Sequence, residues 1–490
     1  MQYHFHAPII TFHDTSLSDL AQLTVPVALV VIPSEQKAAW LQSDAGHDLA
    51  LADSLGRPLE RQVGAQWQQL VFLPEQPVKG TKLYQSIRDA AALVANLPCS
   101  ELALHLEGFT PAAATLLSEL LLQALLSARI PLPSSKHGSE PRPVFTTIHC
   151  SPAVTLSLPA LLGEVEGNGL ARHLAAMPAS ELGASQYRQR VRELAAKEGW
   201  HCHEWDQREL ALRGAGAFLA VARGAEDDGA AIVHLRYAPA NAGSKVALVG
   251  KGICHDSGGY NLKINGGMYG MHLDMGGSAV ALGTLLAISR AGLPIEVDCW
   301  LAIAENHIGP RAFRPSEVVT AANGKTIEVV DTDAEGRMVL ADTLVLAAEQ
   351  APDLLIDYAT LTGACKRALG SRYSGLFCNR PEWLAELVEI GQHSGERVWP
   401  FPLDEDYDDT LKSDWADLLQ CAPGASCDHI DAARFLSHFV PATLPWLHID
   451  LSGFRHKGGH GVVSSEITGF GVRLTLALLA QSRFIANRAV

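Results

Sequence analysis

Short β-rich runs alternate with helical patterns along most of this chain of 490 residues. In the first third, four runs rich in apolar and β-branched residues predict strands at residues 25–32, 69–72, 102–106 and 144–148. Helical periodicity occupies residues 81–97. Thr110 followed by Pro111 predicts an N-cap with proline in the first turn of a further helix. This alternation predicts an α/β architecture.

The same alternation continues beyond a turn-rich break at residues 131–143. Apolar residues spaced as on one helix face predict an amphipathic helix at residues 186–198. The strands expected after it are residues 232–236, 246–249, 297–304, 326–330 and 354–358. Since the chain is too long for one hydrophobic core, we expect two domains. These are a smaller N-terminal α/β domain, residues 1–160, and a larger C-terminal domain, residues 161–490, with a mixed central sheet flanked by helices.

Charge and composition exclude several classes of partner. Lys and Arg number 38 against 53 Asp and Glu, so the net charge is 38 − 53 = −15, and no run of cations is present. Nucleic acid and anionic membrane surfaces are therefore unfavourable main partners. We expect no secretory signal, because the first residues lack a positively charged start followed by an apolar run. We also expect no membrane span, because the apolar stretches are short or interrupted by polar residues. Nine scattered cysteines without a C-x-x-C motif predict reduced thiols in the cytoplasm.

Two stretches concentrate groups capable of chemistry. The first, VGKGICHDSGGYNLK at residues 249–263 with MHLDMGG at 271–277, places lysines and aspartates among glycines just after a predicted strand. Glycine permits the close backbone approach that a ligand site at a strand's carboxyl end requires. Surface loops have the same composition, so this stretch alone does not identify a site.

The second stretch is DTDAEGR at residues 331–337, between a predicted strand and an almost wholly apolar helix at residues 338–348. That helix must be buried, so the carboxylates lie at the rim of a core, where they are costly unless paired or bound to cations. Converging carboxylates can hold two divalent ions that activate water. For the heptapeptide alone, a solvated acidic turn paired with Arg337 is favoured by roughly two to one.

Other motifs give weaker indications. Asp331-x-Asp-x-Glu-Gly, with Asp342 at the twelfth place, resembles part of a calcium loop, but a strand precedes it where a helix is needed. HCHE at residues 201–204 lacks a second histidine at Gln207, so it is no H-E-x-x-H motif. The chain contains no G-x-S-x-G, P-loop or dinucleotide fingerprint. Serine-nucleophile and nucleotide chemistry therefore lack support.

Taken together, the motifs resemble the leucine aminopeptidase family of dinuclear metallopeptidases, the cytosol aminopeptidase and peptidase B group. The ordered match covers residues 251–277, 321–337, 357–365 and 467–473, and residues 435–440 with 446–450 look most like the peptidase B branch. This resemblance implies a metalloprotease, a hydrolase that removes N-terminal L-amino acids from peptides with a free N-terminus.

The resemblance also implies a ligand set for two metal ions, either Zn²⁺ or Mn²⁺. The implied ligands are Lys251, Asp256, Asp274, Asp333 and Glu335. An amine coordinates a metal only without its proton, so Lys251 would be a neutral ligand. Four carboxylates then carry a charge of −4 that balances two dications. Water activated by the metals is the expected nucleophile.

Further roles follow from the resemblance. Lys263 and Arg337 would be catalytic, Lys263 by stabilising the oxyanion and Arg337 by holding a bicarbonate that acts as general base. Leu361 and Gly363 match backbone positions that align the peptide, and Met271 matches a wall of the first side-chain pocket.

At two positions the sequence departs from the family, with His255 where Phe is usual and Asp331 where Asn is usual. Asp331 adds negative charge near the ligands and leaves metal preference open. We interpret His255 as a packing or supporting residue, because five ligands already suffice.

The family resemblance further implies a cytoplasmic homohexamer whose N-terminal domain serves oligomerisation or regulation and carries no catalytic residues. Two other classes stay open on the residues alone. One is a non-enzymatic scaffold or nucleic-acid-binding protein, which the acidic composition disfavours. The other is a two-metal phosphohydrolase, which would share the metal chemistry.

Overall fold

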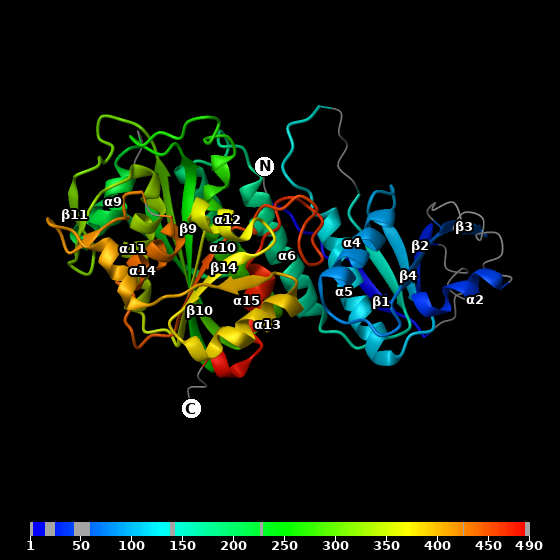
Figure 1. Ribbon diagram of the computed structural model, residues 1–490. Helices are drawn as coiled ribbons and strands as arrows, with labels where there is room; N and C mark the ends of the chain where they lie inside the picture. Colours follow the sequence, from blue (N-terminus) through cyan, green and yellow to red (C-terminus); the bar gives the residue numbers. More distant parts are fainter. Residues whose placement is uncertain are drawn as a thin grey trace. The chain divides into compact units, whose positions relative to one another are not determined.

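The computed structural model of this chain describes residues 3–14, 25–43, 59–137, 143–225, 229–424 and 426–485. The chain divides into two compact units (Figure 1). Unit 1 comprises Met1–Val165 and Lys457–Glu466, and unit 2 comprises Glu166–His456 and Ile467–Val490. The segment Lys457–Glu466 thus returns to unit 1 from late in the sequence.

Unit 1 is built on a six-stranded sheet in the order β1-β6-β5-β2-β4-β3. The strands are β1 (Ile9–Phe12), β2 (Val27–Pro33), β3 (Leu59–Val63), β4 (Gln66–Leu73), β5 (Glu101–Leu106) and β6 (Thr147–Ser151). All neighbours are parallel except the β3–β4 pair. The four strands predicted from sequence are confirmed as β2, β4, β5 and β6, although β6 begins three residues later than predicted.

Helices cover the two faces of this sheet unequally. The long helices α4 (Thr81–Ala95) and α5 (Pro111–Arg129) pack against the apolar face that includes Leu29 and Leu104. The 3₁₀ turn η1 (Ser34–Gln36) leads into α2 (Lys37–Gln42), which packs against the opposite face. The predicted N-cap is confirmed, because Thr110 Oγ1 accepts a hydrogen bond of 3.3 Å from the Ala113 amide.

Unit 2 contains an eight-stranded mixed sheet in the order β15-β14-β17-β13-β9-β10-β8-β7. The strands are β7 (His201–Asp206), β8 (Ala231–Tyr237), β9 (Ser244–Asp256), β10 (Ile295–Asn306), β13 (Leu354–Ala359), β14 (Ser374–Cys378), β15 (Val398–Pro400) and β17 (Trp446–Asp450). The four central strands, β17, β13, β9 and β10, are parallel. The predicted mixed sheet flanked by helices is confirmed. A small sheet joins β11 (Val318–Thr320), β12 (Thr326–Glu328) and β16 (Leu418–Leu419).

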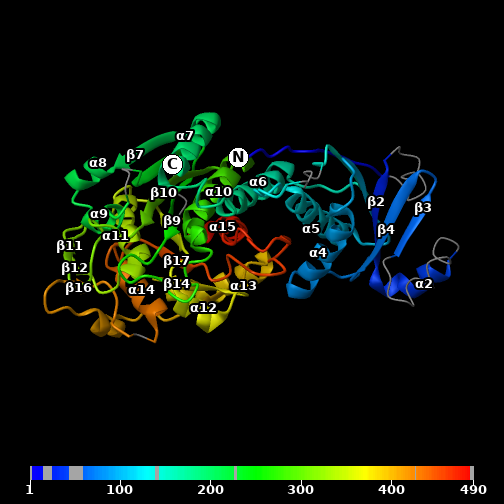
Figure 2. The same ribbon diagram turned by 90° about the horizontal axis from the view of Figure 1, so that it is seen from above.

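Helices cover both faces of the large sheet. The α-helices are α6 (Leu158–Ala175), which contains the boundary between the units, α7 (Ala184–Glu198), α8 (Gln207–Leu212), α9 (Gly216–Ala222), α10 (Gly276–Ala291), α11 (Glu335–Ala348), α12 (Gly363–Leu369), α13 (Leu384–Ser394), α14 (Asp428–Ser437) and α15 (Val472–Leu479). The 3₁₀ helices are η3 (Met271–Met275), η4 (Thr332–Ala334), η5 (Pro381–Trp383), η6 (Glu405–Leu411) and η7 (Ser482–Phe484). In Figure 2, α10 and α15 lie on one side of the central strands and α11 and α14 on the other.

Alternation along β9 assigns its side chains to these two layers. Ala247 and Val249 belong to the same core cluster as the apolar residues of α11, whereas a Cβ on Gly250 would meet Ser278 of α10 at 2.4 Å. Lys251 lies two residues after Val249, so both side chains are on the same face of the sheet, and that of Lys251 extends toward α11. The first residues of α11 and the end of β9 are thereby brought together.

β9 is longer than the sequence indicated. The sequence predicted a strand at residues 246–249 followed by a glycine-rich stretch, but the strand continues to Asp256 because its pairing with β10 extends to Asp256 and Asn306. Lys251 and Asp256 therefore both belong to a buried central strand, which fixes the backbone positions from which their side chains extend.

Close packing places the start of α10 against the sheet. A Cβ on Gly277 would lie 2.0 Å from the Tyr358 carbonyl oxygen, which no larger residue could tolerate without a shift of backbone. Glycine at this position lets η3 and α10 approach β9 and β13, and so it fixes the position of Asp274 just before the helix.

Two helical segments are long and apolar enough to cross a membrane, Pro111–Arg129 and Met271–Ala291. Their apolar windows are 67% and 89% buried, respectively, by the rest of the protein. We therefore interpret both as core helices of their units.

Candidate metal centre

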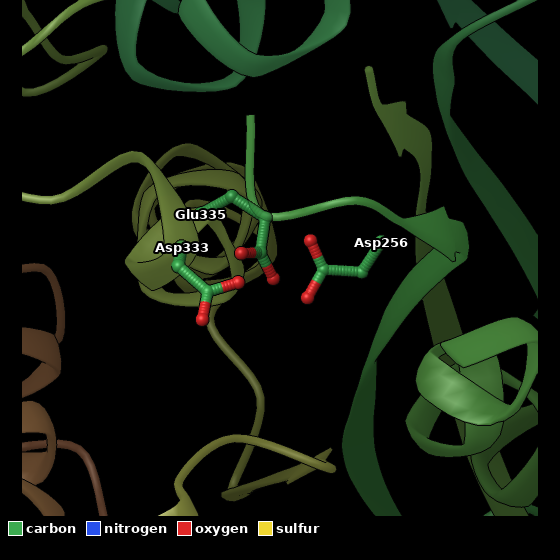
Figure 3. Close-up of side chains that lie close together, drawn as sticks. All are labelled: Asp256, Asp333 and Glu335. Carbon is green, nitrogen blue, oxygen red and sulfur yellow. The ribbon is translucent and has the colours of Figure 1, made fainter. Parts of the chain in front are cut away.

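Five side chains predicted as metal ligands converge at the carboxyl end of β9. Lys251 and Asp256 come from β9 and Asp274 from η3. Asp333 lies in η4, and Glu335 is the first residue of α11. Figure 3 shows the carboxylates of Asp256, Asp333 and Glu335 directed toward one another. One ligand oxygen from each of these three lies within 4.8 Å of the others.

Two lysines bridge the carboxylates in pairs. Lys251 Nζ lies 2.7 Å from Asp274 Oδ2 and 2.8 Å from Glu335 Oε1. Lys263 Nζ lies 2.7 Å from Asp256 Oδ2 and 2.5 Å from Asp333 Oδ1. Each lysine ammonium group thus contacts carboxylate oxygens from two different structural elements.

The carboxylates of Asp256, Asp274 and Glu335 are buried, that of Asp333 is partly buried, and the four repel one another. Burial, together with the charge of Asp256, raises the pKa of Asp333 to about 6 and that of Glu335 well above its ordinary value. Burial also raises the pKa of Asp274 to about 6 against the opposing attraction of Lys251. Four acids this close can ionise together only when cations compensate them.

The negative charges of the surrounding carboxylates favour the protonated form of Lys251. Burial lowers its pKa, but attraction by Asp274, Glu335 and Asp256 outweighs burial and raises the pKa above its usual value. A Cβ on Gly336 would lie 2.6 Å from Lys251 Nζ, so a glycine leaves the space that this amine occupies. The protein groups alone favour a charged lysine, and only divalent cations would displace its proton.

A cavity of about 340 Å³ opens onto these groups. The described residues that line it include nine of the ten predicted site residues: Lys251, Asp256, Lys263, Met271, Asp274, Asp333, Glu335, Leu361 and Gly363. Tyr269 and Phe454 add aromatic surface to its wall. The cavity combines an acidic, lysine-bridged floor with an apolar side, which suits a small ligand that has both a polar reacting group and an apolar side chain.

Arg337 is the predicted site residue that is absent from the described lining of this cavity. It is 2% exposed, and its guanidinium is directed toward α14. Nη2 lies 2.6 Å from Asp428 Oδ1, and Nη1 donates to the Gln420 carbonyl oxygen at 3.2 Å.

Asn306 is a site residue that the sequence analysis missed. Its side-chain amide donates to Asp256 Oδ1 at 2.8 Å, to the Thr332 carbonyl at 2.9 Å and to Glu335 Oε2 at 3.3 Å. It is 1% exposed. The available signal was a polar residue ending an apolar strand beside β9.

The segment 360–363 after β13 carries a second set of missed contacts. Lys251 Nζ donates to the Thr360 carbonyl at 3.2 Å, and Thr360 Oγ1 donates to Asp274 Oδ1 at 2.7 Å. Asp450, at the end of β17, accepts hydrogen bonds from the amides of residues 361 and 362 and from Thr362 Oγ1 at 2.7 Å. Asp450 therefore holds the loop whose backbone borders the cavity.

The two departures from the family pattern lie beside the cluster. The His255 ring stacks on His307 with centroids 5.8 Å apart, and burial and His307 lower the His255 pKa. Asp331 Oδ1 accepts a hydrogen bond of 2.9 Å from the Asp333 amide and so caps η4. The weaker motifs lie elsewhere: HCHE is in the edge strand β7, and Asp342 is inside α11, where its carboxylate accepts two backbone amides.

Comparison with known proteins decides the family. The model of the cytosol aminopeptidase family, catalytic domain, matches residues 169–476. The chain belongs to the cytosol aminopeptidase family. The matched range contains all ten predicted site residues.

Relatives with similar sequences are named probable cytosol aminopeptidases. The chain is 42% identical over 317 residues to a probable cytosol aminopeptidase of Parasynechococcus marenigrum (strain WH8102), covering 64% of each chain. It is 41% identical over 313 residues to one of Chlorobaculum tepidum, covering 63% of this chain and 61% of the relative. The chain thus aligns with less than two thirds of the length of these curated relatives.

Solved structures extend the likeness over nearly the whole chain. The bottromycin maturation enzyme BotP in complex with Mn is 30% identical, with a TM-score of 0.79 over 93% of this chain and 99% of that one. A mutant of tomato leucine aminopeptidase is 25% identical, with a TM-score of 0.84 over 97% of each chain. Leucyl aminopeptidase from Trypanosoma brucei, at 24% identity, shares the fold with a TM-score of 0.81 over 97% of this chain and 96% of that one.

Proposed function

We propose that this protein is a metal-dependent aminopeptidase that hydrolyses N-terminal L-amino acids from peptides. The observation that carries this proposal is the meeting of five donor groups, distant in sequence, on one cavity in a chain of the cytosol aminopeptidase family. The aminopeptidase names of its relatives support it.

The donor set fits two divalent ions, held by Lys251, Asp256, Asp274, Asp333 and Glu335. Their carboxylates are hard oxygen donors, and their mutual repulsion is relieved by dications. The ions are Zn²⁺ or Mn²⁺, and the manganese named for BotP supports the second. When bound, they supply the Lewis acidity that activates water and polarises the scissile carbonyl.

The protein's own groups position the peptide and the developing charge. Burial lowers the pKa of Lys263, but Asp256 and Asp333 outweigh burial and raise it, so Lys263 stays protonated at neutral pH and can donate to the oxyanion. The backbone of Leu361 and Gly363 aligns the peptide, in a loop that Asp450 holds through residues 361 and 362. Met271 forms a wall for the side chain of the N-terminal residue.

The residues around Arg337 do not fit the bicarbonate that the family resemblance predicts there. An internal carboxylate, Asp428, already lies 2.6 Å from its guanidinium. The proposed mechanism therefore has no step through bicarbonate.

The wider context is also part of the proposal. Residues 161–490 would be the catalytic domain and residues 1–160 an oligomerisation or regulatory domain. The family resemblance supports a cytoplasmic homohexamer, and the name cytosol aminopeptidase of the relatives agrees with that location. The net charge of −15 disfavours nucleic acid as a partner.

A substrate panel with metal analysis tests this function. Leucine and other aminoacyl p-nitroanilides should be cleaved, chelators should abolish cleavage, and Zn²⁺ or Mn²⁺ should restore it. N-acetylation of the substrate should block cleavage, whereas p-nitrophenyl phosphate should not be hydrolysed. A metal-loaded protein that cleaves phosphoesters but no aminoacyl substrate would instead be a phosphohydrolase.

A further inference from the structure

The environment of Arg337 differs from what an anion-binding arginine needs. Its guanidinium is buried, and the Asp428 carboxylate pairs with Nη2 at 2.6 Å. The Gln420 carbonyl takes a second donor, Nη1. A charge-assisted pair of this length, with the guanidinium buried and the carboxylate 32% exposed, leaves no unmatched positive charge for a further anion.

The surrounding charges also oppose another anion. Besides Asp428, the first turn of α14 carries the buried carboxylate of Asp431, so a second negative charge lies on the helix that Arg337 faces. Among the described residues, Arg337 Nε is a buried donor without a partner. The three N–H groups that remain, on Nε, Nη1 and Nη2, can serve water molecules, while the positive charge that they share is already matched by Asp428.

The position of Asp428 is fixed by its helix. Asp428 is the first residue of α14, where the helix dipole favours a carboxylate, and α14 packs on α11, which carries Arg337. The pair therefore joins two helices whose packing sets the distance between the two side chains.

We propose that the Asp428 carboxylate occupies the place on Arg337 where the family resemblance predicts a bicarbonate, so that this chain carries its own anion there. Asp428 is then a positioning residue. It compensates a buried cation two residues from the ligand Glu335, and without it that cation would oppose the binding of divalent ions. This inference rests on the proposed function.

Bicarbonate dependence tests the inference. In CO₂-free buffer, metal-loaded wild-type enzyme should cleave an aminoacyl p-nitroanilide at the same rate with and without bicarbonate at constant ionic strength. Asp428→Ala should lose about ten-fold in activity, as removal of a residue that supports a metal site does, and bicarbonate should restore it. Asp428→Asn should lose activity without rescue, because its amide fills the space.

A second readout does not depend on activity. Bicarbonate should raise the melting temperature of Asp428→Ala above that in chloride, but leave the melting temperature of the wild type unchanged. Asp408→Ala is the matched control, since it removes the carboxylate that pairs with Arg434 at the other end of α14 without touching Arg337. Bicarbonate should neither activate nor stabilise this control variant.

Several results would overturn the inference: stimulation of the wild type by bicarbonate, full activity of Asp428→Ala without it, or failure of bicarbonate to stabilise that variant. Inactivity of the wild type on every aminoacyl substrate would count against the proposed function, whereas the melting temperatures would still test the role of Asp428. If Asp428→Ala does not fold, the response of the wild type to bicarbonate still decides between the two anions.

Discussion

The side-chain amide of Asn306 donates to Asp256 at 2.8 Å where β10 and β9 end together. The same amide lies 3.3 Å from Glu335 Oε2. One uncharged residue therefore orients two proposed metal ligands that come from different elements, and the direction of their lone pairs depends on it.

Replacement of Asn306 should weaken metal binding. Asn306→Ala removes the donor shared by two ligands, and we expect metal affinity to fall by about 10- to 100-fold. Competition with a fluorescent chelator measures this. Asn323→Ala is the control, because Asn323 is exposed and donates only to the His438 carbonyl in the described part of the chain. Equal affinities in the two variants would refute the role of Asn306.

Measured metal content should distinguish the roles of the two lysines, Lys251 and Lys263. Lys251→Ala removes a proposed ligand and should lower the number of ions bound per subunit. Lys263→Ala should keep that number and lower kcat by about 100-fold, because it removes a donor to the oxyanion. Metal analysis and kinetics on the same preparations distinguish the two roles, and a Lys263→Ala enzyme with full kcat would exclude the role proposed for this residue.

The hydroxyl of Thr362 should matter more than its methyl group. Thr362 Oγ1 donates to Asp450 at 2.7 Å and so secures the loop beside the cavity. Thr362→Val leaves the buried carboxylate without this donor and should lower kcat/KM by about ten-fold. Thr362→Ser keeps the donor and should stay near the wild-type value, with metal content unchanged in both. A Thr362→Ser variant as impaired as Thr362→Val would show that packing, not the hydrogen bond, is at work.

Stability should depend on pH through Asp342. This residue is buried in α11, and burial raises its pKa to about 7 against the hydrogen bonds from backbone amides. Because the folded-state pKa exceeds the unfolded value of about 3.9, its contribution to stability is full below about pH 4 and is lost as the pH rises toward 7.

Asp342→Asn cannot titrate and serves as the reference. The free energy of unfolding of the wild type minus that of this variant should fall by up to about 1.4 kcal/mol per pH unit between about pH 4 and pH 7. Urea denaturation across that range measures the difference. A difference that stays constant or rises with pH would contradict the shifted pKa.

The family resemblance predicted the convergence of the proposed ligands better than the supports around them. Lys251 and Glu335 stand in motifs that match the family, so the resemblance implied that they meet, whereas the residues alone favoured a solvated acidic turn at residues 331–337. Asn306 ends a strand with no motif of its own, and its contacts depend on the exact register of β10 against β9. Local patterns do not give that register.

The direction of Arg337 could not be predicted either. The sequence placed it just before a helix, and in the structure it lies in the first turn of α11, but its side chain is directed by Asp428, which lies 91 residues later in the sequence. Likewise, glycines suggested a loop soon after the strand predicted at residues 246–249, whereas pairing with β10 extends β9 to Asp256. In both cases a tertiary contact overrode the local signal.

The most direct test of the account is an anomalous-difference map from crystals of the protein grown with Mn²⁺. We predict two neighbouring peaks in each subunit, in contact with Lys251 Nζ and the carboxylates of Asp256, Asp274, Asp333 and Glu335. A map without peaks at this cluster, or with its peaks at other side chains, would contradict the proposed metal centre.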